Sequence, residues 1–365
     1  MSFDVIADRL SAEAEEGILH TAAQLVVIHD GEVRCDLAVG STHLRRPFRP
    51  ETLSALYCTA KPLITVALLR LMDEGELSLD DRLGDVVGGL DSVEGEWIAA
   101  RTIEEVLTHT AGLHSLGSII ARVLPERSRW RWIVDSPPPD GWRFGVDRAY
   151  SEFAGWYLLG QVVEALVGEP YDSFIEHAVL APYGVAGDDL VVRFDPARFE
   201  RERSRISVTL DLTELRPLPL LAEAGIETAC EWNPAFGAYG TMRGLARFWE
   251  GVRGDFDGAG RVASGQLLRA AATPRLPATH DLTLDRTACF ATGFMAPLRE
   301  HEFGEAPSDT AFGHAGQGGT SFGFVDPPNR LVVAALFNAG LDAETSLGFR
   351  RRTLVDAVYR TLDLP

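Results

Sequence analysis

The segment that decides the fold reads Leu56-Tyr57-Cys58-Thr59-Ala60-Lys61-Pro62-Leu63, and it opens an apolar run that continues to Met72. Apolar residues lie on almost every side of this run, which predicts a helix buried on most sides and ended by Gly75. The run carries the single Lys among the 34 Lys and Arg residues of the chain. A buried ammonium can lose its proton, whereas a guanidinium effectively cannot. We therefore interpret Lys61 as a proton-transfer group.

Cys58 lies three residues before Lys61, and positions i and i+3 share one face of a helix. Pro62 fits a first helical turn, because the N–H groups there have no helical partner. The N-terminus of a helix and a neighbouring cation both favour a thiolate over a thiol. The pair therefore predicts a nucleophile with its base. The alternative is a buried structural cysteine beside a lysine that extends its amine to solvent.

Length and composition indicate an ordinary globular protein. The chain has 365 residues, 46% of them hydrophobic and 24% charged, which suggests two domains or one domain with a large insertion. The formal net charge of −19 argues against a nucleic-acid or anionic-membrane partner. The four cysteines show no metal-type spacing, so we expect no metal and no cofactor.

The first nine residues, Met1 to Arg9, lack a basic region followed by an apolar one, so no signal peptide is visible. No apolar run approaches the roughly 18 residues that a membrane helix needs. We therefore expect a cytoplasmic protein with free thiols, in which Cys35, Cys230 and Cys289 are small buried residues.

Strand patterns occur at both ends of the chain. Residues 25–28 form an apolar run, Asp30-Gly31 is a hairpin turn signal, and residues 33–39 alternate with period two. Near the C-terminus, residues 321–325 and 331–337 flank the turn Asp326-Pro327-Pro328-Asn329. A closing amphipathic helix over 346–362 carries a basic patch at Arg350-Arg351-Arg352.

The residues between these ends are mostly helical in pattern. This order predicts an α+β fold, with an antiparallel sheet that is built from both termini and flanked by helices. We assign residues 1–82 and 285–365 to the sheet domain and residues 83–284 to an inserted, mostly helical domain. The active site would lie at their junction.

Three motifs carry the functional prediction: Cys58-Thr59-Ala60-Lys61, Tyr150-Ser151-Glu152 and His314-Ala315-Gly316. Together, in this order and spacing, they resemble the serine β-lactamase and penicillin-binding-protein superfamily. The similarity is greatest to its class C β-lactamase-like branch, which also holds esterases, D-aminopeptidases and acyltransferases. Residues 106–113 are similar to a signature segment of that branch. The resemblance implies a β-lactamase/transpeptidase-like fold.

The resemblance also implies roles for individual residues. Cys58 would be the nucleophile and Lys61 would share its proton. Tyr150 would be the general base for the nucleophile or the acid for the leaving group, kept phenolate-like by Lys61. His314 would supply a cationic or hydrogen-bonding group beside Tyr150. The backbone N–H groups of Cys58 and Gln317 would form the oxyanion hole.

The sequence departs from the family pattern at two positions. Cys58 stands where the family has Ser, and Glu152 stands where it has Asn. Glu152 and Gly316 are expected to contact the substrate, and the Glu152 carboxylate adds negative charge near Lys61. Glu152 could receive a cationic amine on a substrate, or it could be a solvated carboxylate at a helix start. We interpret His109 as a structural residue that ties a loop.

A cysteine nucleophile favours acyl transfer, because amines compete well with water for a thioester. We therefore predict an acyltransferase that takes an acyl group from a small-molecule ester or amide onto Cys58. It would pass the group to an amine or alcohol acceptor, plausibly in natural-product biosynthesis. Three alternatives stay open: an esterase or amidase, a Ser-to-Cys replacement in an otherwise ordinary enzyme, and an inactive relative that only binds a ligand. The sequence does not indicate the oligomeric state.

Overall fold

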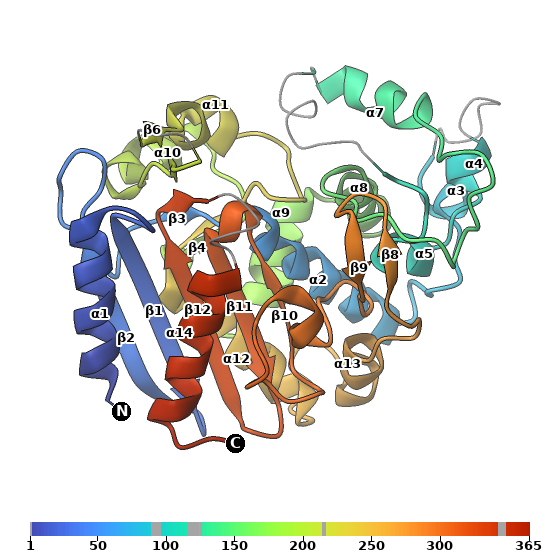
Figure 1. Cartoon of the computed structure of the whole chain (residues 1–365). Coiled ribbons are helices and arrows are strands. Elements are labelled where there is room, and N and C mark those ends of the chain that lie inside the picture. The colour runs from blue at the N-terminus through green and yellow to red at the C-terminus, as the bar shows by residue number, and fades with distance from the viewer. Residues whose placement is uncertain (1, 89–95, 115–123, 125, 214–216, 342–347) are drawn as a thin grey trace.

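A five-stranded antiparallel sheet with the strand order β10-β11-β12-β1-β2 forms one half of the protein (Figure 1). The computed structural model describes residues 2–88, 96–114, 124, 126–213, 217–341 and 348–365. The strands are β1 (Ala22–His29), β2 (Glu32–Gly40), β3 (Ser54–Ala55), β4 (Leu190–Val191), β5 (Leu210–Asp211), β6 (Leu218–Pro219), β7 (Tyr239–Gly240), β8 (Thr279–Asp281), β9 (Arg286–Ala288), β10 (Phe312–Ala315), β11 (Ser321–Asp326), β12 (Leu331–Phe337) and β13 (Ala339–Gly340).

Helices cover both faces of the sheet and make up most of the other half. They are α1 (Phe3–Glu16), α2 (Lys61–Asp73), α3 (Leu83–Val86), α4 (Glu96–Ala99), α5 (Ile103–Leu107), α7 (Glu126–Val134), α8 (Ala154–Val167), α9 (Tyr171–Ile175), α10 (Pro196–Glu202), α11 (Ile226–Ala229), α12 (Met242–Phe256), α13 (Gly265–Ala272) and α14 (Gly348–Thr361). The N- and C-terminal helices α1 and α14 lie together on one face of the sheet (Figure 1), and α12 packs against β1, β11 and β12. The fold class expected from the sequence is confirmed.

The central strands are buried on both faces, which explains their continuous apolar sequences. In β12, Val333 and Ala335 belong to the core beneath α1 and α14, whereas Val332 and Ala334 belong to the core that continues into the helices. Successive side chains of a strand point to opposite faces, so every residue of this strand has an apolar neighbour.

Both hairpins predicted from the sequence are present. Asp30 and Gly31 have φ angles of 55° and 77°, the left-handed values of the two-residue turn that matches strand twist. Beyond this turn the register of the β1–β2 pair shifts between Val27 and Ile28. On the turn side of this shift, Val33 is 58% exposed. On the other side, Cys35 is buried, as the alternating pattern of residues 33–39 predicts. The second hairpin joins β11 to β12 across residues 327–330.

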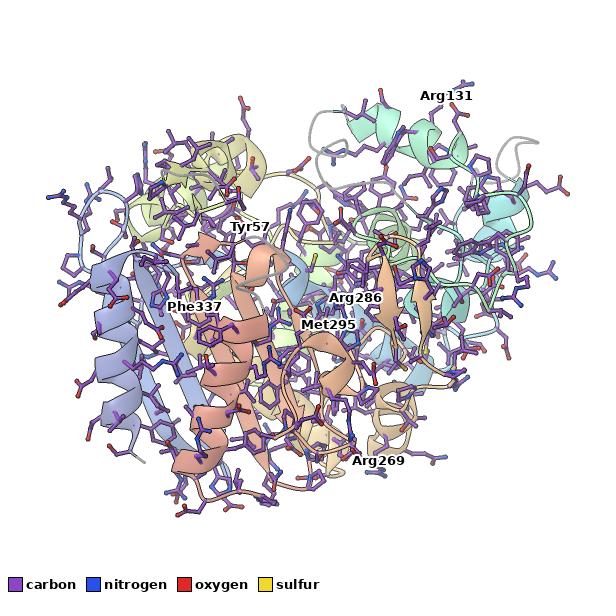
Figure 2. All side chains as sticks on the ribbon, in the orientation of Figure 1. Tyr57, Arg131, Arg269, Arg286, Met295 and Phe337 are labelled. Carbon is purple, nitrogen blue, oxygen red and sulfur yellow. The ribbon has the colours of Figure 1, made fainter. Side chains whose placement is uncertain are left out.

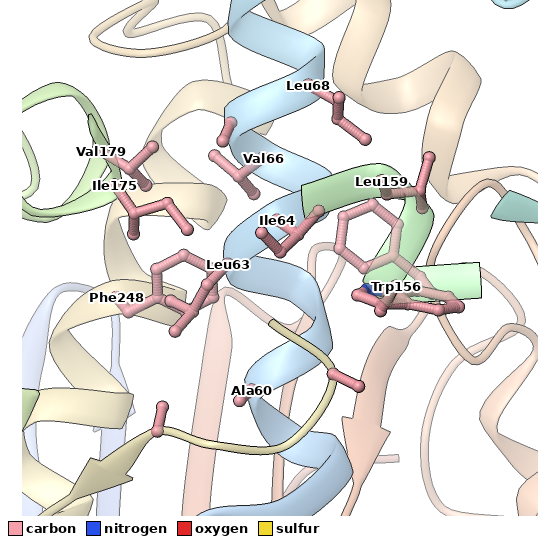
Figure 3. Close-up of a cluster of buried hydrophobic side chains, with 14 of the residues drawn as sticks. Ala60, Leu63, Ile64, Val66, Leu68, Trp156, Leu159, Ile175, Val179 and Phe248 are labelled. Carbon is pink, nitrogen blue, oxygen red and sulfur yellow. The ribbon is translucent and has the colours of Figure 1, made fainter. Parts of the chain in front are cut away.

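Helix α2 runs from the sheet into the helical half of the protein and packs against α8 and α9 (Figure 1). Its residues from Lys61 to Leu69 are all buried, as the apolar run indicated. Figure 3 shows Leu63, Ile64, Val66 and Leu68 of this helix among side chains from α8, α12 and the α9 region. The sheet and the helices therefore share one core, which fixes α2 against both.

The residue boundaries of the inserted domain stay a prediction. The five sheet strands come from residues 22–40 and 312–337, on either side of the range 83–284. Helix α12 lies inside that range, yet it covers one face of the sheet. Among the described residues, no helix is long and apolar enough to cross a lipid bilayer.

Replacing Leu68 by Ala tests the importance of the buried α2 helix. Leu68 is fully buried, so we expect the free energy of unfolding to fall by about 2–5 kcal/mol, since the change removes apolar contacts and leaves a cavity. Leu44 is 59% exposed, and Leu44→Ala should change stability by less than about 0.5 kcal/mol. Urea unfolding of both variants measures the difference. Equal destabilisation of the two variants would contradict this assignment of the core.

Candidate active site

Cys58 lies in a short 3₁₀ turn, η1 (Tyr57–Ala60), that leads directly into α2. The preceding residue, Tyr57, has a φ of 51°, a strained left-handed value for a residue with a side chain. Cys58 is a free thiol, half-buried, and lines a cavity. The helix start predicted near Cys58 is therefore found, with a tighter first turn that carries the sulfur.

Lys61 is fully buried beside this sulfur. Its Nζ donates hydrogen bonds to Cys58 Sγ at 3.3 Å, to the carbonyl oxygen of Glu152 at 2.6 Å and to that of Ala235 at 3.3 Å. The ammonium also lies 5.2 Å from the ring centroid of Trp156, a distance at which a cation and an aromatic face attract. Three acceptors match the three N–H bonds of an ammonium, so its position is fully determined.

Tyr150 is the second group at the sulfur, and its side chain forms a hydrogen bond with Cys58. Burial raises the pKa of Tyr150 well above the usual 10, and the neighbouring Cys58 raises it further. The expectation that Lys61 keeps Tyr150 phenolate-like is therefore wrong. Desolvation disfavours the charged oxygen, so the resting side chain is a neutral phenol that can give a proton.

Two residues position Tyr150. The Asp281 carboxylate ends β8 and accepts hydrogen bonds from the backbone N–H of Tyr150 at 3.0 Å and of Leu284 at 2.9 Å. His109 packs its ring 4.6 Å from that of Tyr150, and its Nδ1 accepts a hydrogen bond from the backbone N–H of Ser151 at 3.0 Å. His109 thus ties the second motif to the α5 loop, in agreement with its structural interpretation. Asp281 was missed, although an Asp before a turn is a familiar turn signal.

His314 lies on β10, with its ring 6.3 Å from that of Tyr150. Burial lowers the pKa of His314 well below 6.5, and the charge on Lys61 lowers it further, so the imidazole is neutral. Its Nδ1 lies 2.9 Å from the backbone nitrogen of Ala315 and 3.1 Å from the carbonyl oxygen of the same residue, so the backbone of Ala315 holds this side of the ring. Of the two roles expected for His314, only the hydrogen-bonding one fits a neutral ring.

The turn after the third motif approaches the nucleophile closely. A Cβ on Gly316 would lie 2.5 Å from Ser321 Oγ and 3.1 Å from the carbonyl oxygen of Leu56, so only glycine fits there. Gln317 is the first residue of the 3₁₀ turn η7 (Gln317–Gly319). No carbonyl oxygen of that turn comes before it, so its N–H has no acceptor within the turn. Within the described part of the chain, neither this N–H nor that of Cys58 donates a hydrogen bond to the backbone. Both N–H groups are thus available as the expected oxyanion donors.

A buried arginine fixes this turn from behind. Arg350 in the first turn of α14 donates hydrogen bonds to the carbonyl oxygens of Gly318 at 3.2 Å, Gly319 at 2.6 Å and Ala339 at 3.0 Å. Arg351 is also buried, whereas Arg352 is exposed. Arg350, Arg351 and Arg352 therefore do not form the single basic patch that the sequence predicts. Successive helical residues point about 100° apart, which sends the three side chains to different environments.

A cavity of about 280 Å³ opens onto the sulfur. Five of the seven predicted site residues line it: Cys58, Tyr150, Glu152, Gly316 and Gln317. The other two, Lys61 and His314, are buried behind the wall. The remaining lining residues are Tyr57, Phe236, Leu284, Arg286, Met295, His301, Glu302, Ala315, Gly318 and Arg351. Figure 2 shows Tyr57, Arg286 and Met295 in this central region. Among the described residues, no group of three or more His, Cys, Asp and Glu side chains could hold a metal ion.

Comparison with known proteins identifies the relatives of this chain. A family model described as "Beta-lactamase" matches residues 12–356. Penicillin-binding protein 4 of Amycolatopsis lactamdurans is 26% identical over 331 residues, which cover 87% of this chain and 81% of the relative.

Two solved structures share the fold. A family VIII carboxylesterase has a TM-score of 0.79 at 23% identity, covering 98% of this chain and 96% of the esterase. EstCE1, described as a hydrolase with promiscuous acyltransferase activity, has a TM-score of 0.73 at 19% identity, covering 97% of this chain and all of that one. Both structures match over nearly the whole chain, so the similarity concerns the complete fold.

Removing the Tyr150 hydroxyl tests whether it protonates a leaving group. We expect Tyr150→Phe to lower kcat/KM for an alkyl ester by about 10²–10⁴-fold, because an alkoxide needs a proton to leave. The loss for the matched p-nitrophenyl ester should be smaller, since nitrophenolate leaves without one. Tyr171→Phe, at a buried tyrosine outside the cavity lining, is the control and should leave both rates unchanged. Equal losses for the two esters would contradict the acid role.

The raised pKa of Tyr150 gives a pH prediction with a definite sign. The folded protein keeps this phenol protonated above pH 10, whereas the unfolded chain ionises it near 10. Above that pH the unfolded state binds fewer protons at this residue, so its contribution lowers stability as pH rises. Ultraviolet phenolate absorbance of the folded wild type and Tyr150→Phe should titrate identically up to pH 10. Extra phenolate in the wild type near neutral pH would refute the neutral phenol.

Proposed function

The chain belongs to the β-lactamase family, and on this basis we propose that it is an acyltransferase that carries its acyl group on Cys58. The observation that carries the proposal is the meeting of three groups at one atom. Lys61 Nζ lies 3.3 Å from Cys58 Sγ. The Tyr150 side chain forms a hydrogen bond with Cys58, and both residues line the cavity. This is the arrangement of a nucleophile with its proton-transfer partners.

In the proposed acylation step, Sγ bonds to the carbonyl carbon of a small-molecule ester or amide, and the bond to the leaving oxygen or nitrogen breaks. Tyr150, which contacts Cys58, gives its phenolic proton to the leaving group and takes the thiol proton, so the leaving group departs protonated while the Lys61 ammonium keeps its charge beside the sulfur. The N–H groups of Cys58 and Gln317 stabilise the oxyanion, each contributing about 3 kcal/mol. All of these groups come from described residues at the cavity or just behind it.

In the second step, an amine or alcohol attacks the thioester carbon, the S–C bond breaks, and the acceptor's proton returns to the sulfur. A thioester reacts with amines in preference to water more readily than an oxygen ester does, which favours transfer over hydrolysis. The carboxylate of Glu152 lines the cavity and could hold a cationic acceptor. EstCE1, which shares this fold, is described as having acyltransferase activity, which supports transfer over hydrolysis as the proposal for this chain.

Hydrolysis by water is the second candidate, because a carboxylesterase shares the fold at a TM-score of 0.79. Partition between an added amine and water separates the two functions. With a p-nitrophenyl ester and a primary amine, we expect wild type to form amide and acid in a ratio about tenfold above that of Cys58→Ser, a difference of about 1.4 kcal/mol in barrier height. Chromatography of the two products measures this ratio.

Two outcomes would refute the proposal. Wild type that forms only acid at every amine concentration is a hydrolase. Wild type that shows no acyl adduct on Cys58 by intact mass, after one equivalent of activated ester, is an inactive ligand-binding relative. Cys58→Ala is the control for the adduct, because it keeps the cavity and lacks the sulfur.

A further inference from the structure

A buried arginine lies two residues before Tyr150 and takes no part in the proposed chemistry. Arg148 is 1% exposed and is absent from the lining of the Cys58 cavity. Its Nη1 donates hydrogen bonds to the carbonyl oxygens of Pro277, at 3.3 Å, and of Ala288. Its Nε and Nη2 are buried without a hydrogen-bond partner among the described residues. A buried cation is costly unless it is paired, so the fold must supply a compensating charge.

The two carbonyl oxygens belong to opposite arms of one hairpin. Pro277 precedes β8 and Ala288 ends β9, and these two strands pair antiparallel (Figure 1). The guanidinium therefore closes the base of the hairpin against the second motif. The turn of the hairpin contributes Leu284 to the lining of the cavity. Arg148 thus ties part of the cavity wall to the segment that carries the proposed acid.

The same hairpin supplies the carboxylate that positions Tyr150. Arg148 and Asp281 are backbone bridge partners, and the N–H of Leu282 donates a hydrogen bond to the Arg148 carbonyl oxygen at 2.9 Å. Oδ1 of Asp281 accepts a hydrogen bond from the backbone N–H of Tyr150 at 3.0 Å. Oδ2 is buried without a hydrogen-bond partner among the described residues. Asp281 is fully buried, so its charge also needs compensation.

Arg148 and Asp281 are oppositely charged neighbours. Burial lowers the pKa of Arg148, whereas Cys289 and Asp281 raise it. Burial raises the pKa of Cys289, so this thiol is neutral at neutral pH and Asp281 is the anion that attracts the guanidinium. Both side chains keep unpartnered polar atoms, so they act on each other through charge. Removing either charge would leave the other one buried alone.

We propose that Arg148 is a positioning residue for the Tyr150 phenol and acts through Asp281 and the β8–β9 hairpin. Its charge keeps the Asp281 carboxylate in place, and that carboxylate holds the backbone of Tyr150. The phenol then stays in hydrogen-bond contact with Cys58, where it gives its proton to the leaving group. This proposal rests on the proposed function, because it assigns a support to the acid of the same reaction.

The turnover of two esters with different leaving groups tests this assignment. A displaced phenol costs most where the leaving group needs its proton, so kcat/KM is measured for a p-nitrophenyl ester and for the matched alkyl ester. Arg148→Met should raise the nitrophenyl-to-alkyl ratio by about tenfold or more, towards the ratio of Tyr150→Phe.

A double variant separates charge balance from the hydrogen bonds at the base of the hairpin. Asp281→Asn keeps an oxygen that can accept the Tyr150 N–H but leaves Arg148 without its counter-charge, so alone it should also raise the ratio. Arg148→Met combined with Asp281→Asn leaves no uncompensated charge, and its ratio should return to within about threefold of wild type. Arg148→Lys keeps the charge and should raise the ratio less than Arg148→Met does.

Arg253→Met is the matched control, at a second buried arginine that lies on α12 outside the cavity lining. It also removes a buried cation, yet it should keep the wild-type ratio. Turnover of the p-nitrophenyl ester reports folding in each variant, since its leaving group needs no proton. Should Arg148→Met fail to fold, Arg148→Lys and the double variant decide.

An Arg148→Met ratio equal to that of wild type would overturn the proposal. A double variant as impaired as the two single changes combined would overturn it too, because the charges would then be independent. A failure of the proposed function looks different. If wild type gives only acid, transfer fails and the same ratios still test Arg148, whereas a wild type without any adduct on Cys58 has no acid step to support and refutes both.

Discussion

The structure around the active site depends on the buried ammonium of Lys61. Its three hydrogen bonds reach the sulfur of Cys58, the backbone of Glu152 and the backbone of Ala235, which belong to three separate segments of the chain. A charge taken out of water must keep all its partners, so moving any one segment would leave a buried donor unpaired. The interaction that prepares the nucleophile is therefore also the one that holds the second motif against α2.

The same burial sets the protonation of the surrounding groups. Tyr150, His109 and His314 are all buried close to Lys61, and desolvation is the largest influence on the pKa of each. Each of the three is neutral as a result, and Lys61 is the cation around which they are arranged. The phenol of Tyr150 is therefore protonated and can act as the acid of the site. The imidazoles of His109 and His314 contribute hydrogen bonds and packing contacts.

Much of this could be predicted from the sequence, because the informative signals are local. The Asp30-Gly31 turn, the buried strands and the spacing of Cys58 and Lys61 each depend on neighbouring residues only. The relation of Asp281 to Tyr150 could not be predicted, since 131 residues separate the two and the turn signal does not name its partner. The ionisation of Tyr150 was predicted wrongly, because proximity to Lys61 was visible in the motifs and complete burial was not.

The three consecutive arginines of α14 show what the fold adds to a sequence pattern. As a string they indicate a basic surface, yet Arg350 supports the turn that carries Gln317, while Arg351 faces the cavity wall. His314, the third-motif residue that could have supplied a cation, is neutral because it is buried beside Lys61. A neutral imidazole cannot balance a negative charge on a ligand, so any such charge must be balanced elsewhere in the cavity. Arg286 and Arg351 line that cavity and place positive charge on its wall, outside the three motifs.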